Sequence, residues 1–306
     1  MAEDSSEIIA DFFVTCNQQL LGLPREQIFG CDETNFRLDA PSNYTYAEIG
    51  ATRVCATTTG HEMQKISVMA CASASGFKFP LVIVVPRKTA LKDFTPPDNT
   101  IVVYKPSGTF DSTLIVESFL KRYVILLHIQ EVFVNFFSSK RVIQPEILRK
   151  NYDKTVLVWD HAPCHLTKEV QDVLVNCRTL SIEIPPKLTG LLQPADVCWF
   201  RTFKLLFRRK YMDWFVNEPK SFTNFGNLRS PGYASVIEWV SDIWQNIDNN
   251  LLIKSFDYCG ITSQNELHHV LHKIHYADQR LGEIVETDIE ADDEADYRAE
   301  LIAGAV

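Results

Sequence analysis

The side chains in this sequence that are best placed for chemistry are three aspartates. Asp32 ends the apolar run Ile28–Cys31, Asp160 ends the run Val156–Trp159, and Asp196 stands at the start of a predicted helix, with 35 residues between it and Asp160. Mg²⁺ prefers hard oxygen ligands and is usually held by one or two carboxylates together with phosphate and water. Two such ions can hold the attacking and leaving oxygens of a displacement at phosphorus. Three aspartates at the ends of rigid elements therefore predict a divalent-metal site for phosphoryl transfer.

Asp32 and Asp160 also have a simpler explanation, as turn residues that follow strands. Asp32, however, ends a run apolar enough to be buried, and a buried carboxylate must be paired, hydrogen-bonded or metal-bound. Glu33 is its rival as a ligand. Because successive side chains of a strand point to opposite faces, Glu33 would point away from Asp32, and we favour Asp32.

Asp196 has the strongest competing explanation, because aspartate is among the most favoured N-cap residues of helices. Yet Asp196, Phe200, Phe203 and Phe207 recur at the spacing of one helical face. If Asp196 is already helical, it points to the same side as these apolar rings, toward the sheet that carries the other two aspartates. This geometry is compatible with metal binding, and capping and metal ligation could share the two carboxyl oxygens.

The segments around the aspartates resemble the catalytic core of the pogo/Tigger/jerky transposases, the DDE-superfamily endonuclease domain. The matching residues are Asp32-Glu33-Thr34, Asp160 to His165, and Pro185 to Val197 (PPKLTGLLQPADV), with further agreement over Ile66–Pro86 and Ser255–Ile261. The resemblance extends over roughly residues 10 to 262, and the third segment is its most specific part.

What the resemblance implies is an RNase H-like fold and a metal-dependent endonuclease or transposase, which cleaves and transfers nucleic-acid strands. Asp32, Asp160 and Asp196 would be its catalytic residues and its ligands for Mg²⁺ or Mn²⁺, with two ions expected, and His165 and Gln193 would support them. DNA is the implied partner, a homo-oligomer on DNA is a further candidate assembly, and the nucleus is the implied location.

A zinc site is the rival interpretation of the second segment. His161, Cys164 and His165 lie close together in the sequence, and Cys198 is the one plausible fourth ligand. Their spacing fits no familiar tetrahedral site. We therefore expect His165 to orient the site or to contact phosphate.

A cluster of basic residues follows Asp196 on the same predicted helix: Arg201, Lys204, Arg208, Arg209 and Lys210. The first three are spaced so that they share one helical face. A solvated helix face would explain them on its own, but beside a metal site they predict a track for the phosphate backbone. Lys187 and Thr189, in the loop before Asp196, are expected to add contacts that position the backbone.

The order of elements predicts an α/β fold of the RNase H-like class, with a mixed sheet flanked by helices. A helical lead-in (residues 1–26) should precede the core (27–262), a short helical segment (263–280) and an acidic, disordered tail (281–306). The expected strands are Gln27–Asp32, Thr52–Thr59, Lys65–Ala74, Phe79–Val85, Thr155–Asp160 and Leu180–Ile184. Three strands that meet at turns should give the sheet an antiparallel start.

Capping residues mark two helix starts. Asp111 or Ser112 should cap a helix whose apolar face runs from Val116 to Leu127, and Thr167 should cap the next helix. Residues 129–153 resist this pattern and are expected to be an insert or a gene-model error, since structureless connections of that length are uncommon in compact domains.

The overall charge of −9 is unevenly distributed. From Leu281 onward there are nine acidic residues and one basic residue, so residues 1–280 hold 30 acidic and 29 basic residues and are close to neutral. The eight cysteines form no C-x-x-C pair, which indicates a reducing compartment. No apolar run reaches the 18 or so residues of a membrane span, so no membrane association is expected.

Two functions of different class remain open at this point. All three aspartates are present, which favours an active enzyme. The alternative is a domesticated, catalytically inactive descendant that serves as a DNA- or protein-binding module. The resemblance begins almost at Met1, without the helix-turn-helix domain usual in the family, and this absence and the insert favour the alternative.

Overall fold

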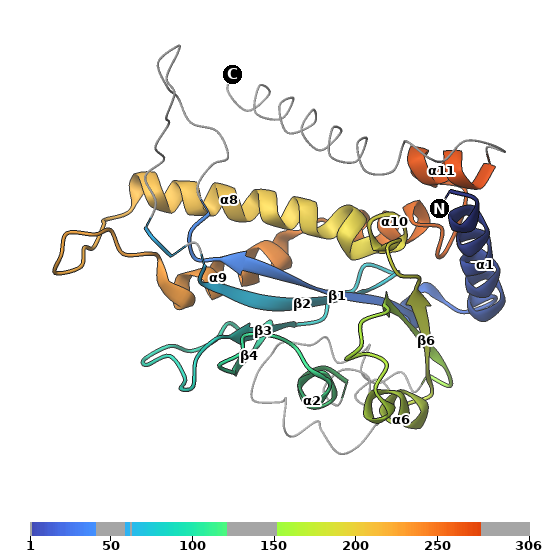
Figure 1. The fold of residues 1–306 in the computed structure, drawn as a ribbon, viewed down its shortest axis with the longest axis horizontal. Helices are drawn as coiled ribbons and strands as arrows, with labels where there is room; N and C mark the ends of the chain where they lie inside the picture. Colours follow the sequence, from blue (N-terminus) through green and yellow to red (C-terminus); the bar gives the residue numbers. More distant parts are fainter. Residues whose placement is uncertain (1, 41–58, 62, 121–151, 277–306) are drawn as a thin grey trace, which may run out of the picture.

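The computed structural model of this chain describes residues 2–40, 59–61, 63–120 and 152–276. They form a mixed six-stranded sheet of order β4-β3-β2-β1-β5-β6 with helices on both faces (Figure 1). The strands are β1 (Ile28–Arg37), β2 (Lys65–Ser73), β3 (Leu81–Val85), β4 (Thr100–Tyr104), β5 (Thr155–Asp160) and β6 (Thr179–Ile184). This is the architecture that the sequence predicted.

The strand pairing combines an antiparallel meander with parallel pairs. β1 pairs antiparallel with β2, and β2 with β3, as predicted. β5 lies parallel to both β1 and β6. β4, parallel to β3, was not predicted, and the predicted strand Thr52–Thr59 lies outside the described residues except for Thr59.

Two hydrophobic cores cover the two faces of the sheet, because successive side chains of each strand point to opposite faces. In β5, Val156 and Val158 join one core, and Leu157 and Trp159 join the other. Burial on both faces explains why the central strands are apolar without a break.

The helices are α1 (Ala2–Leu20), α2 (Ser112–Leu114), α6 (Lys168–Asn176), α7 (Thr189–Leu192), α8 (Phe200–Asn217), α9 (Gly232–Asn246), α10 (Asn249–Tyr258) and α11 (His269–Tyr276), with the 3-10 turn η1 (Arg25–Gln27) and the π-helical turns η2 (Ile115–Leu120) and η3 (Ala195–Trp199).

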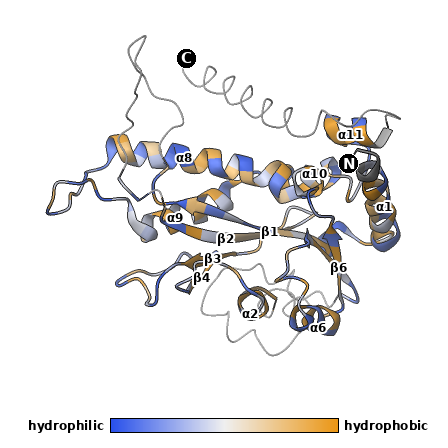
Figure 2. Ribbon diagram, in the orientation of Figure 1, coloured by the Kyte–Doolittle hydropathy of each residue, from blue (hydrophilic) through white to orange (hydrophobic). Residues whose placement is uncertain are grey.

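The long helix α8 packs on the face of the sheet that carries Asp32. Its apolar residues Phe203 and Phe207 are buried, and their rings lie 4.8 Å and 4.9 Å from the ring of Phe36 in β1. Hydrophobic and hydrophilic residues alternate along α8 (Figure 2), and its buried residues are Phe200, Phe203, Phe207, Tyr211 and Trp214. The predicted apolar face of this helix is therefore confirmed, and the packing brings the start of α8 close to β1.

The predicted caps have different outcomes. Asp111 caps α2 by accepting the Leu114 backbone N–H at 2.9 Å, as expected. Thr167 stands at the N-cap position of α6, but its hydroxyl makes no cap hydrogen bond. It donates to the Cys164 carbonyl at 3.5 Å instead, so the capping role is corrected. All but the last two residues of the predicted insert, and the acidic tail, lie outside the described residues.

Among the described residues, each helix is too short or too polar to span a bilayer. The described cysteines are all free thiols.

Candidate functional site

Asp32 is positioned by the alternation of β1. The residue is 7% exposed and lies on the same strand face as Phe36, toward α8. One of its carboxyl oxygens accepts the backbone N–H of Glu33 at 2.8 Å. The carboxyl group is thus held rigidly in a largely dry environment.

Asp160 is brought beside Asp32 by the parallel pairing of β1 with β5. The paired residues Ile28 and Val156, and Gly30 and Val158, are in register. Asp32 and Asp160 each lie two residues beyond the paired residues Gly30 and Val158, so they are neighbours on adjacent strands, which lie about 4.8 Å apart. Asp160 ends β5 as predicted, whereas Asp32 lies in the middle of β1, which continues to Arg37 and does not end at Asp32 as the sequence predicted.

Asp196 approaches from the helical side. It lies inside the π-helical turn η3, in which the Phe200 N–H bonds to the Ala195 carbonyl. Pro194, not Asp196, occupies the N-cap position, so the capping explanation of Asp196 is wrong. The Asp196 carboxyl accepts a hydrogen bond from the side chain of Thr189. Single π turns are often found at functional sites.

The carboxyl groups of Asp32 and Asp196 are hydrogen-bonded to each other. Burial, followed by the nearby charge of Asp196, raises the pKa of Asp32 well above its usual value. Asp196 is an exposed residue, yet partial burial of its carboxyl raises its pKa, against the opposing effect of the hydrogen bonds from Asp32 and Thr189. Without a metal, the two carboxyl groups therefore oppose each other's ionisation.

His165 closes the site beneath Asp160. Its ring stacks on Trp159 with 4.1 Å between ring centroids. Nδ1 lies 2.7 Å from a carboxyl oxygen of Asp160, and Nε2 lies 3.4 Å from Glu33. Burial by itself lowers the pKa of His165, but Asp160 and Glu33 outweigh it and raise the pKa to about 10. The ring is therefore an imidazolium at neutral pH.

The donor set fits a divalent cation. Oδ1 of Asp160 is buried and lies 2.7 Å from His165 Nδ1, which also bonds to the Asp160 backbone carbonyl at 3.2 Å. A buried carboxyl oxygen is costly unless a positive charge lies beside it, and His165 supplies part of that charge. The carboxyl groups of Asp32 and Asp196, whose pKa values are raised, and the oxygens of Asp160 form an all-oxygen donor set of the kind that Mg²⁺ or Mn²⁺ prefers.

The sequence interpretation did not include Glu33 among the metal ligands, but in the structure Glu33 contacts His165. As predicted, it points to the other face from Asp32. Glu33, Asp160 and His165 bring their ligand atoms within 4.8 Å of one another, the one such group of His, Cys, Asp or Glu among the described residues. The D-x-x-x-x-H spacing located His165, but no local signal pairs it with Glu33.

The sequence profile of the DDE superfamily endonuclease domain matches residues 63–256, more than half of the chain. The chain belongs to the DDE superfamily endonuclease family. The match begins after β1, so Asp32 is placed in the site by the structure and not by the profile.

Two mammalian proteins are similar to this DDE chain. The mouse protein "Pogo transposable element with KRAB domain" is 25% identical over 272 residues, 87% of this chain and 41% of that protein. The human protein of the same name is 24% identical over 266 residues, 85% and 40% of the two chains. The predicted resemblance to pogo-like transposases is confirmed, and the chain spans about two fifths of the length of these relatives.

Solved structures with a similar fold include Mos1 transposase complexes. A pre-cleavage Mos1 transpososome matches with a TM-score of 0.53 and 13% identity over 92% of this chain and 65% of that one. The Mos1 mariner paired end complex with Mn matches with a TM-score of 0.52 and 14% identity over 90% and 62%. This likeness confirms the RNase H-like fold of the DDE domain.

The zinc ligand set is not assembled in the described part of the DDE domain. His161 lies 2.8 Å from Glu183 and forms an ion pair when protonated. His165 is engaged with Asp160 and Glu33, and the group described above contains no cysteine. Proximity in the sequence did not bring these side chains to one centre.

Gln193 links the backbone segments that carry Asp32 and Asp196 in the DDE domain. It is 1% exposed, and its Nε2 donates to the carbonyl of Cys31 at 3.2 Å. Because Cys31 precedes Asp32 and Gln193 lies three residues before Asp196, this bond ties together the two backbone segments that carry these aspartates.

The basic cluster of the DDE domain divides over two sides of α8. Lys204 is exposed and close enough to Asp196 to oppose the rise of its pKa. At about 100° per residue, Lys210 lies opposite Arg201, and its Nζ pairs with Asp242 of α9 at 2.7 Å. Lys210 therefore does not share the face of Arg201, Lys204 and Arg208. Lys187 is exposed before the site, with a positive φ of 68°.

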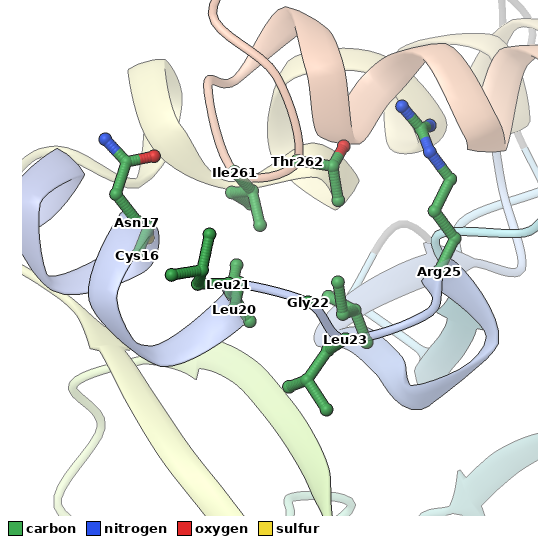
Figure 3. A pocket seen from close by; sticks show the side chains of 10 residues that line it. Cys16, Asn17, Leu20, Leu21, Gly22, Leu23, Arg25, Ile261 and Thr262 are labelled. Atoms are coloured by element: carbon green, nitrogen blue, oxygen red, sulfur yellow. The ribbon is translucent and has the colours of Figure 1, made fainter.

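A separate hollow of about 320 Å³ lies between the end of α1 and the loop after α10 (Figure 3). Its lining is both polar and apolar, and Arg25 is the one charged residue among the lining residues. Arg25 donates to both carboxyl oxygens of Asp257, at 2.7 and 3.0 Å. None of the three aspartates lines this hollow, so it is not part of the acidic site.

Proposed function

We propose that this chain is the metal-dependent core of a pogo-like transposase, which cleaves DNA strands and transfers them. The observation that carries the proposal is the meeting of three carboxyl groups from three separate segments, Asp32 on β1, Asp160 on β5 and Asp196 before α8. A fold has little reason to bring together groups that repel one another unless a cation binds there.

Asp32, Asp160 and Asp196 are the proposed ligands of Mg²⁺ or Mn²⁺, with two ions. Structures of the Mos1 mariner paired end complex are known with Mn and with Mg, which supports the choice of metal. Bound ions would supply charge stabilisation at phosphorus and activation of the attacking oxygen.

The residues of this chain prepare the site for the metal. A bound cation would favour the ionised forms of Asp32 and Asp196, whose pKa values are raised without metal, so binding should release protons. His165 holds Asp160 from the side of the second core and balances part of the negative charge. Gln193 fixes the spacing between the segments of Asp32 and Asp196.

DNA is the proposed substrate. Arg201, Lys204 and Arg208 would follow its backbone along α8, and Lys187 and Thr189 would add contacts beside Asp196. These contacts are to phosphates, so binding should show little sequence preference. Arg209 is a further candidate, a homo-oligomer on DNA is the proposed assembly, and the nucleus is the proposed location.

The test is nicking of supercoiled plasmid by the purified chain with Mg²⁺, with Mn²⁺ and with EDTA. Wild type should nick only with metal, and Asp160→Asn should lose activity by several orders of magnitude. Asp172→Asn, an exposed aspartate in α6, is the matched control and should keep full activity. Metal-independent nicking, or nicking retained by Asp160→Asn, would overturn the proposal.

The domesticated binding module remains the second outcome of this experiment. Wild type that binds DNA and Mn²⁺ but leaves the plasmid intact would support it.

A further inference from the structure

His268 is a buried histidine that lies outside the three segments carrying the aspartates. Its hydrogen bonds connect the helices α10, α11 and α7. It is 6% exposed and stands immediately before α11. Its backbone N–H donates to the Tyr258 carbonyl at the end of α10, at 3.2 Å. Its Nδ1 accepts the Leu271 backbone N–H at 3.3 Å, and its Nε2 lies 3.1 Å from the Leu191 carbonyl.

The two ring nitrogens make different hydrogen bonds, and this fixes the tautomer. Since Nδ1 accepts a backbone N–H, the neutral ring must have its proton on Nε2, which then donates to Leu191. Leu271 is the third residue of α11, so Nδ1 acts as the N-cap acceptor of this helix. The His268 side chain thus caps α11 and also donates a hydrogen bond to the carbonyl of Leu191, 77 residues earlier in the sequence.

That carbonyl belongs to the short helix α7, which leads directly to Asp196. Carbonyls in the last turn of a helix lack donors within the helix, so Leu191 needs an external one. On either side of it, Thr189 bonds to the Asp196 carboxyl and Gln193 bonds to the Cys31 carbonyl. The His268 bond is therefore placed between the two contacts that orient this turn toward the site.

We propose that His268 is a positioning residue of the metal centre, which fixes the α7 turn through Leu191 and thereby the place of Asp196. The inference rests on the proposed function, because it assumes that Asp196 binds metal. His268 lies beyond the residues 63–256 that match the family profile. The α10–α11 segment then takes part in metal binding without contacting the metal.

Two substitutions separate the cap from the anchor. Asparagine is among the most favoured N-caps, so His268→Asn should still cap α11, but its side chain is too short to reach Leu191. His268→Leu loses both hydrogen bonds. His272→Asn changes an exposed histidine on the same helix and is the control. Calorimetric titration of the full chain with Mn²⁺ measures affinity, and melting in EDTA measures the fold without metal.

We expect Mn²⁺ affinity to fall roughly tenfold in His268→Asn and in His268→Leu, and to stay unchanged in His272→Asn. Melting in EDTA should stay close to wild type for His268→Asn. An affinity of His268→Asn within twofold of wild type would overturn the role of His268, whereas a wild type that binds no Mn²⁺ would overturn the proposed function itself.

If both variants fail to fold, amide hydrogen exchange on the wild type decides. Mn²⁺ should then increase protection in residues 189–196 and in residues 268–271 together. Protection gained by the first segment alone would overturn the proposal.

Discussion

Nδ1 of His165 lies 2.7 Å from a carboxyl oxygen of Asp160, five residues earlier, while Nε2 of the same ring faces Glu33. The side chain of His165 is 1% exposed, so this imidazolium is held almost entirely by two carboxylates and by its stack on Trp159. A buried cation at this position predicts a specific dependence of stability on pH.

In EDTA, the contribution of His165 to the free energy of unfolding should decrease as pH rises. Its pKa in the folded protein is about 10, raised from 6.5, so the stabilisation is complete below pH 6.5 and is lost as pH rises through about 10. The difference in unfolding free energy between wild type and His165→Gln, measured by urea denaturation, should shrink by a few kcal/mol across this window. A constant difference would contradict the raised pKa.

Asp32→Asn should stabilise the metal-free protein at neutral pH. Since burial and Asp196 raise the pKa of Asp32, the folded protein disfavours its ionised form, and a neutral amide removes that cost. We expect a gain of about 1 kcal/mol in EDTA and a loss of the rise in melting temperature that Mn²⁺ gives to wild type. Asp172→Asn serves as control. If Mn²⁺ still raises the melting temperature of Asp32→Asn as far as that of wild type, Asp32 is not a ligand.

Gly260→Ala should be strongly destabilising. Gly260 follows α10 with a φ of +72°, and an added Cβ would lie 2.4 Å and 2.8 Å from ring atoms of Phe13. Left-handed strain and overpacking together should cost more than about 3 kcal/mol in urea unfolding. Gly226→Ala is the matched control, because its φ is +81° but no atom lies within 4 Å of the new Cβ. Equal costs for the two variants would show that packing against Phe13 contributes nothing.

Lys204→Ala with Arg208→Ala should weaken DNA binding and flatten its salt dependence. Each phosphate contact that is lost should reduce the slope of log affinity against log salt by about 0.9 on duplex DNA. Lys210→Ala should change little, because Lys210 pairs with Asp242 on another side of α8. Fluorescence anisotropy over a salt series measures both. A larger effect for Lys210→Ala than for the double variant would indicate that DNA contacts the opposite side of α8.

The sequence by itself determined the features that depend on local pattern. The continuous apolar runs predicted β1 and β5, the helical spacing predicted the inward face of Phe203 and Phe207, and Asp111 marked the start of α2. The three aspartates were likewise identified from motifs of a few residues. Such features could be predicted because residues close in sequence determine them through strand alternation, helical period and caps.

Only the tertiary structure decided which distant groups meet. β4 is a short run whose pairing with β3 requires a crossover, and no local signal shows it. Glu33 meets His165, Lys210 meets Asp242, and His268 meets the Leu191 carbonyl, each across at least 32 residues of sequence. Helix packing and strand register set these contacts, because they determine which parts of the chain become neighbours once the two cores are buried.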